Sequence, residues 1–98
     1  MSDDDWGFAA PPFNTEGALT ALKRSLRDLK LAERGSGFEL RGKRVVELVV
    51  EGGVLQAKLA RRLVLTPEWD RSTIADANAQ RKWLDELKKR LARWETED

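Results

Sequence analysis

The sequence predicts a small α+β domain with the element order α-β-β-β-α. We expect a three-stranded antiparallel meander with both helices packed on one face. Leucines recur at helical spacing near the N-terminus, and leucines with tryptophans do so near the C-terminus. Between them, residues 45–60 alternate apolar and polar side chains around two glycines, which is typical of a β-hairpin.

The chain of 98 residues has room for one domain. We expect residues 15–95 to form the α+β domain, between a partly flexible tail at 1–14, rich in aromatic residues and proline, and an acidic tail at 96–98. Trp6 and Phe8 are unusually apolar for a tail. They either fold back on the domain or bind a partner, so both are candidate partner-binding residues.

The first helix is expected to begin at Asn14 or Thr15, since either side chain can cap a helix N-terminus. Its apolar stripe has spacings of three and four residues and consists of Leu19, Leu22, Leu26 and Leu29. We expect the glycines of the RGSG segment, residues 34–37, to end this element, with the stop falling between residues 29 and 34.

Two apolar segments flank Gly52 and Gly53, which favour a two-residue hairpin turn. This turn places Val50 opposite Leu55 and Glu47 opposite Lys58. The core-facing residues are expected to be Val46, Leu48, Val50, Leu55, Ala57 and Leu59. The opposite, open face would carry Val45, Glu47, Val49, Gln56, Lys58 and Ala60.

The strand at residues 38–40 is expected to precede the hairpin through a three-residue loop, residues 41–43. This loop places Phe38 opposite Val46 and Leu40 opposite Arg44, so that both apolar residues join the core face. Gly42 would supply the left-handed backbone conformation of such a loop.

The TPEWD segment, residues 66–70, is interpreted as a helical turn or a bend, and a long helix is expected from about residue 76 to 95. The apolar stripe of this helix is Trp83, Leu84, Leu87, Leu91 and Trp94. Glu86 with Arg90, and Asp85 with Lys89, have the spacing and order of stabilising ion pairs.

The absence of cysteine and histidine limits the catalytic and metal-binding chemistry that the chain could perform. Cysteine would be needed for a disulfide or a thiolate nucleophile, and histidine is the usual general base and metal ligand. The serines have no histidine to activate them, and neither RGKR nor EGGV has the spacing of a phosphate-binding loop. We therefore expect no enzyme activity, no catalytic or metal site and no cofactor.

Charge is unevenly distributed along the chain. Of 17 acidic residues, six lie at the chain ends, which leaves 11 against 18 basic residues between positions 6 and 94. Five of the basic residues are expected at one end of the hairpin, where Arg44 would face Arg61 and Lys43 would face Arg62. These candidate polyanion-binding residues are Arg41, Lys43, Arg44, Arg61 and Arg62. The alternative is a solvated strand edge, where such charges discourage edge-to-edge pairing.

Two functions remain as hypotheses, with an enzyme subunit completed by a partner as a weaker third. The first is a non-enzymatic protein-interaction or structural adaptor module that binds an unidentified protein. It would use the open sheet face at Val45 and Val49, an edge strand, or Trp6 and Phe8. The alternative is nucleic-acid binding by the basic end of the hairpin. We expect a protein that does not engage a membrane, because no apolar run approaches membrane-spanning length. We also expect it to be cytoplasmic, and to be a monomer or weak homodimer.

Overall fold

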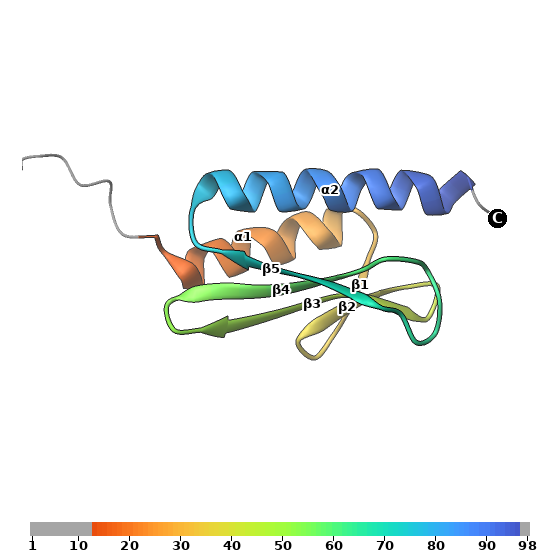
Figure 1. The fold of residues 1–98 in the computed structure, drawn as a ribbon, viewed down its shortest axis with the longest axis horizontal. Coiled ribbons are helices and arrows are strands. Elements are labelled where there is room, and N and C mark those ends of the chain that lie inside the picture. The colour runs from red at the N-terminus through yellow and green to blue at the C-terminus, as the bar shows by residue number, and fades with distance from the viewer. Residues whose placement is uncertain (1–12, 97–98) are drawn as a thin grey trace, which may run out of the picture.

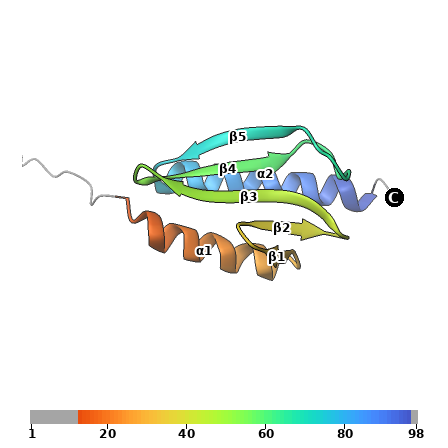
Figure 2. The same cartoon turned by 90° about the horizontal axis from the view of Figure 1, so that it is seen from below.

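The computed structural model describes residues 13–96, which form two helices and a five-stranded antiparallel sheet. Both helices lie on the same face of the sheet, as Figure 1 shows. The other face, here called the open face, is covered by no helix of the described residues (Figure 2). Trp6 and Phe8, with most of the expected N-terminal tail, lie outside the described residues, as do residues 97–98.

The sheet is larger than the sequence predicts. Its strands are β1 (Ala32–Arg34), β2 (Gly37–Leu40), β3 (Lys43–Glu51), β4 (Val54–Ala60) and β5 (Trp69–Ile74), and they lie in that order across the sheet. The α+β class and the helix placement are therefore confirmed, whereas the three-stranded meander is wrong. Strands β1 and β5, one at each edge, are the two additional strands.

Helix α1 (Thr15–Asp28) begins where the sequence predicts, with Asn14 as its cap. The Asn14 side chain accepts a hydrogen bond from the Gly17 N–H at 3.1 Å. The helix ends at Asp28, and Lys30 takes a left-handed φ of 71° just beyond it. The glycines of the RGSG segment were expected to end this helix, but they lie beyond its end. Instead, Gly35 lies in the turn between β1 and β2, and Gly37 begins β2.

The central hairpin has the predicted register. Val46 pairs with Leu59, Glu47 with Lys58, and Val50 with Leu55. Gly52 and Gly53 form the turn with φ values of 61° and 79°, a conformation that glycine adopts without strain. The Thr15 hydroxyl donates a hydrogen bond to the Gly53 carbonyl and so fixes the start of α1 to the hairpin tip.

The connection between β2 and β3 differs from the prediction. Phe38 pairs with Val46 as expected, but Leu40 pairs with Lys43, which leaves a two-residue turn at residues 41–42. The extra residue lies within the ladder instead, as a bulge that leaves Val45 without a partner on β2. The bulge interrupts the alternation of faces, and both Val45 and Val46 are fully buried. Val45 is therefore not exposed on the open face, contrary to the prediction.

Helix α2 (Ala77–Thr96) follows β5 and matches the expected C-terminal helix within one residue at each end. The Asp76 carboxylate accepts a hydrogen bond from the Ala79 N–H at 2.7 Å, which caps the helix. The helix buries Trp83, Leu87 and Trp94 against the sheet, and these pack with Leu22 and Leu26 of α1 in one core. Because both apolar stripes face the same sheet surface, the molecule has two layers.

Candidate functional site

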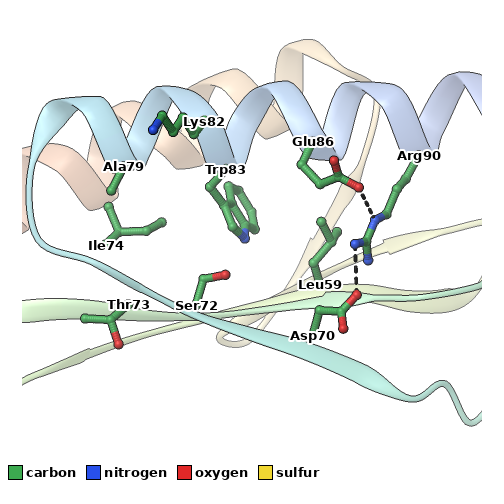
Figure 3. Close-up of a pocket in the computed structure, with 10 residues that line it drawn as sticks. All are labelled: Leu59, Asp70, Ser72, Thr73, Ile74, Ala79, Lys82, Trp83, Glu86 and Arg90. Carbon is green, nitrogen blue, oxygen red and sulfur yellow. Dashed lines mark hydrogen bonds and ion pairs between the residues drawn. The ribbon is translucent and has the colours of Figure 1, made fainter.

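A hollow of about 320 Å³ lies between β5 and the middle of α2. Its floor and walls are largely apolar and come from Leu59, Ile74, Ala79 and the ring of Trp83. Polar side chains rim it from both elements, as Figure 3 shows: Asp70, Ser72, Thr73, Lys82, Glu86 and Arg90. An apolar hollow with a few convergent polar groups is the usual form of a ligand site, and we take it as the candidate functional site.

The Trp83 side chain is 5% exposed, and its indole Nε1 is buried without a hydrogen-bond partner. Figure 3 shows this nitrogen directed away from α2 toward the β5 side of the hollow, where Ser72 lies. An indole N–H can only donate, and a buried donor left unsatisfied costs about 1 to 3 kcal/mol. The fold therefore keeps a hydrogen-bond donor aimed into an apolar hollow.

Arg90 closes one end of the hollow and joins α2 to the sheet. Its guanidinium lies 2.8 Å from the Asp70 carboxylate and 2.8 Å from the Glu86 carboxylate, and it donates to the Ala60 carbonyl at 3.0 Å. The Arg90 side chain is only 13% exposed. Its donors are therefore engaged by the protein itself, and it is a structural clamp for this end of the site.

Asp70 is shared between two arginines. Its carboxylate also accepts a hydrogen bond from the Arg61 Nε at 2.8 Å. The pKa of Asp70 lies below its ordinary value, first because of the hydrogen bond from Arg61 and then because of that from Arg90. Asp70 is thus held as a carboxylate, and it is not an acid that could donate a proton near neutral pH.

β5 forms the edge of the sheet beside the hollow, and the pairing pattern shows which of its backbone groups face outward. The Arg61 N–H donates to the Glu68 carbonyl at 3.0 Å, and this pair continues the register of β4 and β5. Hydrogen-bonded pairs alternate with non-hydrogen-bonded pairs along an antiparallel ladder. Three residues therefore bond to β4, namely Asp70, Ser72 and Ile74, whereas Trp69, Arg71 and Thr73 direct their N–H and C=O groups away from the sheet.

The five predicted polyanion-binding residues do not form one unopposed cluster. Arg44 lies 2.9 Å from Glu47 and 3.9 Å from Glu39. Arg61 is bonded to Asp70 and lies 3.2 Å from Glu68. Ion pairs with acidic residues of β2, β3, β5 and the β4–β5 loop thus replace the like-charge contacts that were expected. Lys43 and Arg62 make no ion pair within residues 13–96, and Arg41 is exposed in the β2–β3 turn with a left-handed φ of 55°.

The structure does bring Arg61 and Arg62 together with a residue that the sequence prediction missed. They line a hollow of about 490 Å³ with Arg93 and Trp94 of α2, at the end of the molecule where β4 finishes. Arg93 is far away in the sequence and belongs to the last turn of α2. Only the packing of α2 across the sheet places it near the β4–β5 loop.

Of the two open-face candidates, only Val49 is exposed, at 48%. It lines a shallow hollow of about 270 Å³ on the open face with Glu47, Glu51, Gln56, Ala57, Lys58 and Arg71. Opposite charges alternate around this hollow, and Glu47 is already paired with Arg44 and Lys58. It offers no buried unsatisfied group to a ligand, so it is a weaker site than the hollow under α2.

Comparison of the chain with protein-family models, with curated proteins and with solved structures found no match. In the part of the chain that the structure describes, no helix has the length and apolar character required to cross a membrane. No group of three or more metal-binding side chains is found within the same residues.

Proposed function

We propose that this protein is a non-enzymatic protein-interaction module that binds an extended segment of a partner protein along the outer edge of β5. The observation that carries the proposal is the outward row of backbone groups on Trp69, Arg71 and Thr73, directly beside a ligand-sized hollow. An extended peptide that adds to a sheet edge gains affinity from main-chain hydrogen bonds and specificity from pockets for alternate side chains.

The geometry of such an added strand follows from the pairing of β5. A partner residue opposite Arg71 would exchange main-chain hydrogen bonds with it. A partner residue opposite Ser72 would place its side chain on the helix face of the sheet, because residues directly opposite each other share a face. Ser72 lines the hollow under α2, so this second residue is the one that the hollow would receive.

The test is selection of heptapeptides from a phage-displayed library, followed by affinity measurement on two variants of Arg71. Arg71→Pro removes one outward N–H without removing a hydrogen bond to β4, and edge strands accept proline at such positions. Arg71→Ala removes the same side chain but keeps the N–H. We expect selected peptides to bind Arg71→Ala within about threefold of the parent and Arg71→Pro at least about tenfold more weakly.

Two results would contradict the proposal. One is the failure of the library to yield any binder. The other is a set of binders with equal affinity for both Arg71 variants. Sedimentation of the unliganded protein completes the test: a dimer that dissociates in Arg71→Pro would identify a second copy of this chain as the occupant, in place of a foreign segment. Equal thermal unfolding of the two variants is the control for folding.

A second candidate function is nucleic-acid binding at the hollow lined by Arg61, Arg62 and Arg93. The favouring observation is that three arginines line one surface, two of which, Arg62 and Arg93, make no ion pair within residues 13–96. This function predicts affinity for random single-stranded DNA that falls steeply with salt. It also predicts that Arg62→Ala weakens this binding whereas Lys82→Ala, on a distant part of α2, does not. Absence of binding at low salt would rule it out.

A further inference from the structure

We infer that the hollow between β5 and α2 is a recognition pocket for a neutral primary amide, such as the side chain of asparagine or glutamine in an extended partner segment. The inference deepens and rests on the proposed function, because it names the residue that the bound segment would insert. Four features of the hollow support a primary amide as its occupant: its donor, its second polar group, its size and its charges.

The donor is the Trp83 Nε1, which has no hydrogen-bond partner and is buried, so an occupant of the hollow reaches it only when a lining side chain moves aside. A ligand that lacks an acceptor would leave this N–H unsatisfied in the bound state, whereas a carbonyl oxygen would satisfy it. A purely aliphatic side chain would therefore fill the apolar part of the hollow without using its one buried polar group. The occupant must carry an acceptor.

The second polar group is the Ser72 hydroxyl, which lines the hollow and makes no hydrogen bond within residues 13–96. Figure 3 shows this hydroxyl directed from β5 toward the Trp83 indole, which comes from α2. A hydroxyl can both accept and donate. A primary amide matches the pair, since its oxygen can accept from Trp83 while its NH₂ donates to Ser72.

The size of the hollow agrees with a side chain rather than with a large free ligand. At about 320 Å³ it lies at the lower limit of small-molecule pockets. Such pockets span about 300 to 1,000 Å³. Its apolar lining from Leu59, Ile74 and Ala79 suits the methylene groups that carry an amide.

The charges around the hollow disfavour a carboxylate at the same position. The guanidinium of Arg90 is occupied by Asp70, Glu86 and the Ala60 carbonyl. A carboxylate ligand would meet these two acidic side chains and would compete with them for one arginine. Lys82 is exposed at the rim, where solvent screens its charge. A neutral acceptor avoids this desolvation and repulsion.

The direct test follows the indole N–H signals of the four tryptophans by NMR during titration with butyramide and, separately, with sodium butyrate. Trp83→Phe assigns the Trp83 signal by its disappearance. We expect butyramide to shift the Trp83 indole signal saturably at millimolar concentrations, and butyrate to leave it unchanged. Ser72→Ala, a change at an exposed position, should weaken the butyramide effect at least about threefold. An unmoved Trp83 signal, or equal shifts with amide and carboxylate, would overturn the inference.

The peptide library separates this inference from the proposed function. If both hold, selected heptapeptides are enriched in asparagine or glutamine at one position, and selection on Ser72→Ala loses that enrichment. Binders that depend on the Arg71 N–H but show no amide preference would support the proposed function and overturn the pocket assignment. A butyramide shift without any peptide binder would support the pocket assignment and overturn the proposed function. It would assign the hollow to a free amide ligand.

Discussion

The Arg90 guanidinium on α2 lies 2.8 Å from the Asp70 carboxylate on β5, and this ion pair joins the helix layer to the edge of the sheet. Asp70 holds Arg61 through its other oxygen, at 2.8 Å. One carboxylate thus ties together the end of β4, the start of β5 and the fourth turn of α2. The clamp lies at one end of the candidate site and connects its two walls.

We expect Arg90→Met to destabilise the protein by about 2 kcal/mol, since hydrogen bonds to charged groups contribute about 1.5 to 3 kcal/mol and exposed ion pairs less. Methionine keeps the apolar stem but leaves the Ala60 carbonyl and the Asp70 carboxylate without this donor. Urea unfolding measures the effect. Lys89→Met is the matched control, because Lys89 is exposed and, contrary to the predicted pair with Asp85, makes no ion pair within residues 13–96. Equal effects of the two changes would show that the clamp contributes nothing.

The stability of the protein should fall in acid partly because Asp70 titrates. Its pKa is lower in the folded chain than its ordinary value, first because of Arg61 and then because of Arg90. A carboxyl of this kind stabilises the fold above its unfolded pKa, and the contribution is lost as the pH falls through the folded pKa. Asp70→Asn should therefore lower the free energy of unfolding at about pH 7 and have a smaller effect at about pH 2.

Urea unfolding at these two pH values checks the Asp70 prediction. Asp85→Asn provides the comparison, because Asp85 is exposed on α2 and makes no ion pair within the described residues. A loss for Asp70→Asn that is the same at both pH values would contradict the prediction, since a group that no longer ionises cannot contribute through its charge.

The elements that could be predicted from sequence are those whose local pattern and tertiary role agree. The hairpin register follows from the glycine turn, the alternation of its strands and the Glu47–Lys58 pair, which lies at 3.8 Å in the structure. Helix α1 begins at its capping residue, and α2 follows its apolar stripe. The predicted pair of Glu86 and Arg90 also forms, at 2.8 Å. These features depend on contacts that the sequence places close together.

The parts of the structure that could not be predicted from the sequence depend on tertiary contacts. β5 contains only two apolar residues, Trp69 and Ile74, at its ends, because the residues between them lie at an exposed edge. β1 is three residues long and wholly exposed, so no apolar period indicates it. The candidate hollow could not be predicted either, since Trp83 lies on the apolar stripe of its helix and the pattern therefore indicates a core residue. Only the packing of α2 against β5 shows that its N–H lacks a partner.

Gly37→Ala should destabilise the protein by about 2 kcal/mol, within the range of overpacking substitutions. A Cβ at this position would lie 2.6 Å from the Val46 carbonyl oxygen and 2.6 Å from the Arg44 guanidinium. Arg44 could move away, but the backbone of β3 is held by its pairing with β2 and β4. The loss should therefore persist in an Arg44→Ala background, as measured by thermal unfolding. If Arg44→Ala restores the stability of Gly37→Ala, the clash with the Arg44 side chain alone causes the loss, and the prediction is contradicted.

The Gly52 position separates backbone strain from packing, because no atom lies within 4 Å of a Cβ built there while its φ is 61°. Gly52→Val should destabilise the hairpin by about 1 to 2 kcal/mol, the cost of a left-handed conformation for a branched residue. Gly52→Asn, which tolerates this conformation, should be close to neutral. Urea unfolding compares the two variants, and equal losses would mean that the turn needs glycine for some reason other than its φ. If the predicted difference is found, the turn conformation contributes directly to the register that places Lys58 beside Glu47, and thereby to the position of β4, on which β5 and the candidate site are built.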